Sequence, residues 1–123
     1  MKVILSIKPE YAERILNGQK KFEFRKCIFK NEKVDTVIIY ATMPVGKVVG
    51  EFKIGDILSL APQELWTSTK KYAGISRQFF DEYFSDREKG FAIGVEAPLR
   101  YKVPLNLTDI IPGATPPQSF RYV

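Results

Sequence analysis

The sequence predicts an α+β fold: a strongly bent mixed sheet or small β-barrel of five or six strands, flanked by two or three helices. Several short runs are rich in β-branched and aromatic residues, as strands are. Two other stretches repeat apolar residues at helical spacing, and glycines and prolines separate these runs. Since no linker, repeat or low-complexity tract divides the chain, residues 1–123 are expected to form a single domain.

The first 18 residues predict a buried strand followed by a helix. Residues 3–7 are a short, mostly apolar run. Pro9 suits the first turn of a helix, because its missing N–H has no partner there. Apolar residues then recur at helical spacing as far as Leu16. Asn17-Gly18 predicts the end of the helix, since glycine readily adopts the conformation that terminates helices.

Residues 18–26, Gly-Gln-Lys-Lys-Phe-Glu-Phe-Arg-Lys, carry four cations and one carboxylate. With a period of two, Phe22 and Phe24 point to one face of a strand, and the charged residues around them point to the other, namely Lys21, Glu23 and Arg25. One interpretation is an amphipathic strand with a solvated face. The other is a charged row that binds a ligand.

The middle of the chain predicts two further strands. Residues 36–41 are β-branched and almost continuously apolar, as is typical of a central strand, and Pro44 ends that run. Residues 47–60 resume extended structure, with Gly50 marking a bulge, a bend or a close backbone approach. Gly55-Asp56 predicts either a bulge or a tight turn.

The second half predicts helices and then strands. Residues 62–72 suit a short helix or two, and Ser76 is a good N-cap for a helix over 77–84. The aromatic residues of that helix fall on one face. Residues 90–96 predict a buried strand, and residues 99–105 alternate between apolar and polar.

The C-terminal tail, residues 112–123, contains three prolines that predict irregular structure. Its last residues include Phe120 and Tyr122, whose rings would gain stability by burial. We therefore expect the tail to dock back onto the domain.

Composition narrows the possible chemistry. The formal net charge of +5 favours an anionic partner, RNA or a nucleotide. The absence of histidine excludes a Ser-His-Asp triad and His-based metal sites, and no phosphate-binding loop is present, so we expect no metal and no cofactor. Any catalysis would use lysine, carboxylate, tyrosine or hydroxyl groups.

Two further expectations concern location. No apolar run approaches the roughly 20 residues that span a bilayer, and the N-terminus does not have the pattern of a signal peptide. The single cysteine, Cys27, is compatible with a reducing environment. We therefore expect a cytoplasmic protein without a membrane partner.

Five sequence blocks occur in a recognisable order: LSIKPEYAERILNG, GQKKFEFRK, VIIYATMP, VVGEFKIGDI and PPQSFRY. In this order the chain resembles the ASCH family of the PUA-like superfamily over nearly its whole length. The family's glycine, lysine and arginine correspond to Gly18, Lys20 and Arg25, with Glu23 between the last two.

The resemblance implies a PUA-like β-barrel with a cleft beside it, lined by the lysine–arginine strand and the start of the first helix. A nucleotide or RNA would bind there. Members of the family are proposed to be RNA-binding regulators, while some branches are an acetylcytidine amidohydrolase or have ribonuclease activity. The chain departs from the amidohydrolase branch, because Glu23 replaces its threonine and residues 70–74 lack its acid.

The candidate site therefore combines cations with groups that can contact a base. Arg25 suits bidentate recognition of phosphate or guanine, and Lys8 and Lys20 add point charges for the backbone. Tyr40 or Tyr83 would stack a base, and polar base edges would be read by two tail residues, Gln118 and Ser119.

Three functions remain open from the sequence. The first is an RNA- or nucleotide-binding module. The second is a metal-independent hydrolase acting on RNA or a modified nucleoside, with Lys20 and Glu23 as catalytic groups. The third is an adaptor whose basic face only keeps it in solution. At single positions, Arg25 and Glu23 can instead form a structural salt bridge, and Tyr40 can instead fill the core.

Overall fold

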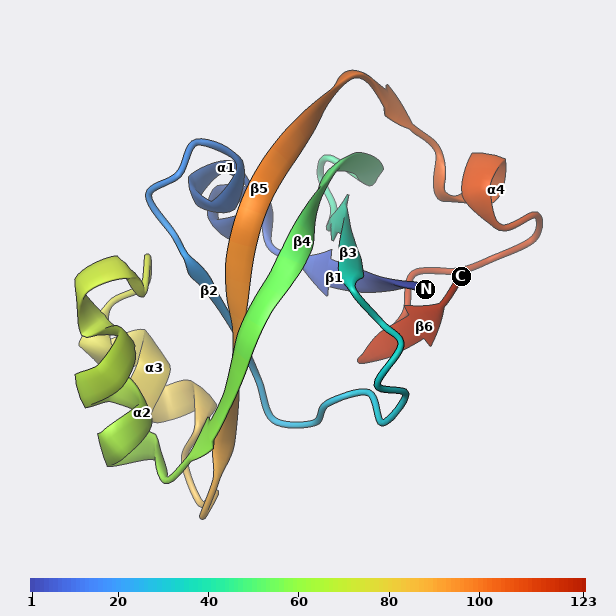
Figure 1. Ribbon diagram of the computed structural model, residues 1–123. Coiled ribbons are helices and arrows are strands. Elements are labelled where there is room, and N and C mark those ends of the chain that lie inside the picture. The colour runs from blue at the N-terminus through green and yellow to red at the C-terminus, as the bar shows by residue number, and fades with distance from the viewer.

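The computed structural model describes residues 1–123 and shows a six-stranded mixed sheet that curls into a half-barrel, with helices at its sides (Figure 1). The predicted α+β fold is confirmed. In chain order the elements are β1 (Lys2–Ile7), α1 (Pro9–Leu16), β2 (Phe22–Arg25), β3 (Thr36–Ala41), β4 (Lys47–Leu60), α2 (Pro62–Thr69), the 3₁₀ helix η1 (Lys70–Tyr72), α3 (Arg77–Tyr83), β5 (Gly90–Leu105), α4 (Leu107–Ile110) and β6 (Phe120–Tyr122).

The strands are ordered β2-β5-β4-β3-β1-β6 across the sheet. Only the pair β1–β3 is parallel. β4 and β5 are the longest strands and form a twisted ribbon through the molecule (Figure 1). Of the two alternatives for Gly55-Asp56, the bulge is the one formed, because β4 continues past these residues with a register shift between Ile54 and Ile57.

The side chain of Arg25 spans the gap between the two edges of the sheet. β2 and β6 are the edge strands, and Arg25 lies at the end of β2. Its guanidinium donates through Nη2 to the Ser6 carbonyl of β1 at 2.7 Å and through Nη1 to the Ser119 carbonyl at 3.4 Å. A side chain thus bridges the open seam where a closed barrel would have strand pairing.

The largest core cluster lies between α1 and the sheet, with Ile15, Val37 and Ile39 fully buried. A second cluster lies beneath α2 and α3. Here the predicted aromatic face of α3 divides, because Phe80 and Phe84 are buried while Phe79 and Tyr83 stay partly exposed. The two partly exposed rings become important for the site.

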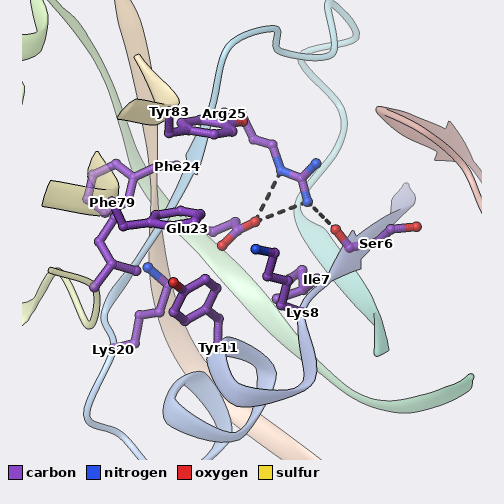
Figure 2. A pocket seen from close by; sticks show the side chains of 11 residues that line it. Ser6, Ile7, Lys8, Tyr11, Lys20, Glu23, Phe24, Arg25, Phe79 and Tyr83 are labelled. Carbon is purple, nitrogen blue, oxygen red and sulfur yellow. Dashed lines mark hydrogen bonds and ion pairs between the residues drawn. The ribbon is translucent and has the colours of Figure 1, made fainter. Parts of the chain in front are cut away.

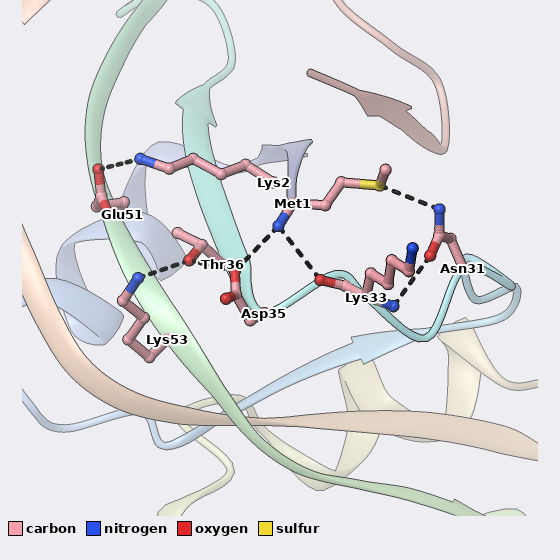
Figure 3. A network of polar contacts seen from close by, with 8 residues as sticks. All are labelled: Met1, Lys2, Asn31, Lys33, Asp35, Thr36, Glu51 and Lys53. Carbon is pink, nitrogen blue, oxygen red and sulfur yellow. Dashed lines mark hydrogen bonds and ion pairs between the residues drawn. The ribbon is translucent and has the colours of Figure 1, made fainter.

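A polar network ties the N-terminus to the neighbouring strands (Figure 3). The Met1 ammonium lies 3.6 Å from the Asp35 carboxylate and donates to the Lys33 carbonyl at 3.2 Å. On β4, Lys53 donates to the Thr36 hydroxyl at 2.9 Å. The Met1–Asp35 pair is exposed, so solvent and salt screen it, whereas the Thr36 hydroxyl that Lys53 contacts is buried.

The C-terminal segment lies along β1. It is irregular through its prolines, as expected, but then forms β6, which pairs antiparallel with β1. The Ser6 hydroxyl donates to the Pro117 carbonyl at 2.7 Å, and the Phe120 ring meets Phe29 edge-on at 5.9 Å.

α4, which was not predicted from the sequence, has a capping box formed by Asn106 and Asp109. None of the helices combines the length and the apolar composition that a membrane span requires.

Phe120→Ala is expected to lower the free energy of unfolding by about 2 kcal/mol, because it removes the ring that packs on Phe29. Tyr122→Ala is the control on the same strand; its side chain is 41% exposed, so a smaller loss is expected. Urea unfolding measures both. Equal losses would contradict an anchoring role of Phe120.

Candidate functional site

A pocket of about 180 Å³ opens at the seam of the half-barrel (Figure 2). The end of β1 and the start of α1 form one side, β2 forms the second, and α3 with the loop before it forms the third. Its lining residues are Ser6, Ile7, Lys8, Tyr11, Lys20, Glu23, Phe24, Arg25, Ile75, Phe79 and Tyr83.

Lys20 is the most unusual residue of the pocket, because its side chain is only 1% exposed and forms no ion pair. Its Nζ donates to the Ala73 carbonyl at 2.7 Å and lies 4.7 Å from the centre of the Phe24 ring. Burial lowers the pKa of Lys20 to about 8, although the charge of Glu23 opposes this shift. A buried ammonium with one hydrogen bond has donor capacity left for a ligand.

Glu23 and Arg25 form a largely buried ion pair beside Lys20. The Glu23 Oε2 atom accepts from Arg25 Nε at 3.1 Å and lies 3.0 Å from Nη2 (Figure 2). Glu23 Oε1 has no hydrogen-bond partner. All the buried side-chain oxygens of the structure do have a partner, so Oε1 is not one of them. Oε1 is therefore accessible to solvent, and it is a hydrogen-bond acceptor that a ligand can reach.

Aromatic rings from α1 and α3 form another wall of the pocket. The rings of Phe79 and Tyr83 are stacked, with centres 6.3 Å apart, and Tyr11 meets Phe79 edge-on at 5.4 Å. The Lys8 ammonium lies 4.8 Å from the centre of the Phe79 ring. Burial raises the pKa of Tyr83, which keeps its phenol neutral.

The pocket therefore pairs an excess of positive charge with flat apolar surfaces. Three cations and one carboxylate line it. Such an arrangement suits an anionic ligand that carries an aromatic ring, because the cations attract the charge and the rings stack. No three His, Cys, Asp or Glu side chains are grouped as a metal site would require.

The structure brings five of the predicted site residues together: Lys8, Lys20, Glu23, Arg25 and Tyr83. It places the other three predicted site residues outside the pocket. Tyr40 is 6% exposed and packs in a separate cluster, so it presents no ring face to a base in this pocket. The exposed residues Gln118 and Ser119 do not line the pocket, and Ser119 reaches it only through its carbonyl contact with Arg25.

Two features of residues 20–25 bear on the sequence interpretation. Of the two interpretations left open for the charged face, the solvated face is not the one formed, since Glu23 is 7% exposed and ion-paired. Lys20, expected as a point charge for an RNA backbone, is enclosed. Lys20 is enclosed because the loop before α3 places the Ala73 carbonyl against its ammonium group, and Arg25 is held by Glu23 and by the Ser6 carbonyl of β1. The contacts with Ala73 and Ser6 join parts of the chain that are distant in sequence.

Several lining residues were not among the predicted site residues, most importantly Ser6, Tyr11 and Phe79. The aromatic face of α3 and the apolar face of α1 were both predicted. No sequence signal showed that Phe79 and Tyr11 would stay uncovered where these faces meet.

The sequence model of the ASCH domain family matches residues 5–99 of the chain. The chain is 32% identical over 125 residues to the ASCH domain-containing ribonuclease of Zymomonas mobilis, covering 98% of this chain and 82% of that protein. It superposes on the crystal structure of ASCH from Zymomonas mobilis with a TM-score of 0.92 and 30% identity, covering 99% of this chain and 87% of that one.

A third similarity concerns a longer protein, the large ribosomal subunit protein uL22 of Ureaplasma parvum. The identity is 29% over 108 residues, covering 87% of this chain but only 34% of that protein. The resemblance drawn from the five sequence blocks is thus confirmed. On the family model and the relative from Zymomonas mobilis together, the chain belongs to the ASCH domain family.

Proposed function

We propose that this protein binds RNA and takes one of its bases into the seam pocket. The observation that carries the proposal is Lys20, a buried cation without a carboxylate partner, beside the accessible Oε1 of Glu23. The pocket volume of about 180 Å³ is smaller than the roughly 300–1,000 Å³ of pockets for drug-sized ligands, which favours a single base.

The parts of a nucleotide match the parts of the pocket. A base inserted beside Phe79 would gain roughly 1–3 kcal/mol from stacking. Lys20 would donate to the edge of the base, and Glu23 Oε1 would accept from it. Lys8, which is exposed, and Arg25 would contact phosphate groups. The similarity to the Zymomonas mobilis ribonuclease supports RNA as the polymer.

A second candidate function is cleavage of RNA, and the pKa of Lys20 near 8 favours it, because such a group can hold or release a proton near neutral pH. The RNA 2′-oxygen would bond to phosphorus as the bond from phosphorus to the 5′-oxygen breaks, giving a 2′,3′-cyclic phosphate and a 5′-hydroxyl. Glu23 would take the proton of the 2′-hydroxyl. Lys20 would give one to the leaving oxygen, and Arg25 would stabilise the phosphorane. Proton exchange with water then returns Glu23 to its carboxylate form and Lys20 to its ammonium form.

The deciding experiment incubates labelled single-stranded RNA and a set of modified nucleosides with the native protein, with Lys20→Met and with Lys33→Met, each with and without a chelator. Lys33 is exposed and does not line the pocket, so its variant is the control. We expect Lys20→Met to weaken RNA retention by about tenfold or more.

Each outcome separates the candidates. Salt-sensitive retention of intact RNA that depends on Lys20 supports the binding module. A product that the native protein and Lys33→Met make, but Lys20→Met does not, shows an enzyme and identifies the bond it breaks. RNA retention that is absent, or equal in all three proteins, would overturn the proposal and favour an adaptor.

The affinity for RNA is expected to fall as the pH rises from about 7 to about 9. The pKa of Lys20 is about 8, so its ammonium is present below that pH and lost above it, and an anionic ligand prefers the charged form. Fluorescence anisotropy at constant ionic strength measures the change. The same affinity at both pH values would contradict a direct contact between Lys20 and the ligand.

A further inference from the structure

Two segments far apart in the sequence meet beside the pocket, and both lack acidic residues. No Asp or Glu lies between Glu13 and Glu23, nor between Glu64 and Asp81. The first segment contains Arg14, Lys20 and Lys21, and the second contains Lys70, Lys71 and Arg77.

Backbone contacts hold the segments together. The Lys21 N–H donates to the Tyr72 carbonyl at 2.9 Å, and Arg14 Nη1 donates to the Gly74 carbonyl at 2.9 Å. The Lys20 ammonium adds its bond to the Ala73 carbonyl. These contacts place η1 of the second segment against the residues that lead into β2.

On the outer side of this junction lie four exposed residues that we name the lysine–tyrosine patch: Lys21, Lys70, Lys71 and Tyr72. The ammonium groups of Lys21 and Lys71 lie 4.3 and 5.5 Å from the centre of the Tyr72 ring. A ring orients an ammonium group without neutralising it. None of the three lysines has a carboxylate within salt-bridge distance.

The patch and the pocket are formed by residues that are neighbours along the chain. Lys21 follows Lys20 directly, and Tyr72 precedes Ala73, which holds the Lys20 ammonium. Two residues further on, Ile75 lines the pocket. A strand with one nucleotide in the pocket therefore has its next phosphates near uncompensated positive charge.

We propose that the lysine–tyrosine patch is a second binding surface, which holds the sugar–phosphate backbone of single-stranded RNA adjoining the nucleotide in the pocket. The inference rests on the proposed function and deepens it. The pocket takes one base, and the patch makes the protein prefer an oligonucleotide to a mononucleotide.

The test compares two triple variants that lose the same charge. In the patch variant, Lys21→Gln, Lys70→Gln and Lys71→Gln are combined. In the control variant, Lys33→Gln, Lys89→Gln and Lys102→Gln are combined; these lysines are also exposed and form no salt bridge. Each protein is titrated with a nucleoside monophosphate and with a single-stranded RNA of about ten nucleotides, at several salt concentrations.

We expect the patch variant to bind the oligonucleotide more weakly, with a slope of log K against log salt that is smaller by about 2, from about 0.7 for each lost phosphate contact. Its affinity for the monophosphate should equal that of the control variant. Equal effects of the two triple variants on the oligonucleotide would overturn the inference and leave the proposed function intact. Failure of the native protein to bind either ligand would overturn the proposed function itself.

Discussion

Replacing Lys20 with methionine is expected to stabilise the fold at pH 7 by about 1–3 kcal/mol while weakening RNA binding by about tenfold or more. The lysine is 1% exposed, and burial lowers its pKa from 10.5 to about 8, so the folded protein holds an ammonium group in an environment that disfavours it. Methionine has a similar length and carries no charge. The variant gives up the bond to the Ala73 carbonyl, which offsets part of the gain.

The stabilisation should depend on pH in a defined direction. The folded-state pKa of Lys20 is below its ordinary value, so between about pH 8 and 10.5 the unfolded chain binds more protons, and the native protein gains stability as the pH rises. The methionine variant lacks this gain. Its advantage should therefore be greatest below pH 8 and shrink towards pH 10.5.

Urea unfolding of the native protein, Lys20→Met and Lys33→Met at several pH values measures both effects. The exposed Lys33 position should change stability by no more than about 0.5 kcal/mol. If Lys20→Met were less stable than the native protein at pH 7, the lysine would be a structural residue. Stabilisation with loss of binding is the pattern expected of a residue kept for function.

Gly74→Ala is expected to destabilise the protein by about 3 kcal/mol and to displace Lys20. Gly74 has a φ of +67°, in the left-handed region, and a Cβ atom there would lie 2.4 Å from the Cβ and 2.5 Å from the Cγ of Lys20. The atoms in conflict are the first carbons of an enclosed side chain, so they cannot move aside freely.

Gly113→Ala is the matched control. Gly113 has a φ of +74°, but a Cβ atom there would meet nothing within 4 Å. It should therefore report only the backbone cost of an L-residue at positive φ, about 1–2 kcal/mol. The difference between the two variants in thermal or urea unfolding isolates the conflict with Lys20. Equal losses would mean that the loop before α3 yields without disturbing Lys20.

Much of the local structure is legible in the sequence. Pro9 and Asn17-Gly18 delimit α1 closely, Ser76 caps α3 by accepting from the Phe79 N–H, and the apolar run at 36–41 is the fully buried β3. These features depend on backbone preferences and on the hydrophobicity of near neighbours, which a short stretch of sequence contains. The five ordered blocks likewise sufficed to identify the ASCH family.

The sequence also pointed to Lys20, Glu23 and Arg25, but it did not show how far they are buried or how burial changes their charge. Alternation along the strand placed Glu23 and Arg25 on one face without telling what covers it, and it did not place Lys20, which precedes the strand. The loop before α3, 53 residues further along the chain, places the Ala73 carbonyl against Lys20, and β1 holds Arg25 through the Ser6 carbonyl, while Phe79 and Tyr83 of α3 also line the pocket. Burial then turned an expected surface cation into an ammonium with a lowered pKa.

By itself, the sequence determined most of the element types, α4 and β6 excepted, together with the family and the strand that carries Glu23 and Arg25. Only the tertiary structure decided that Tyr40 lies in the core, that Phe79 and Tyr11 join the pocket, and that Arg25 bridges the seam. The physical reason is that secondary structure follows from contacts between near neighbours, whereas solvation and charge pairing depend on which distant segments exclude water from a side chain.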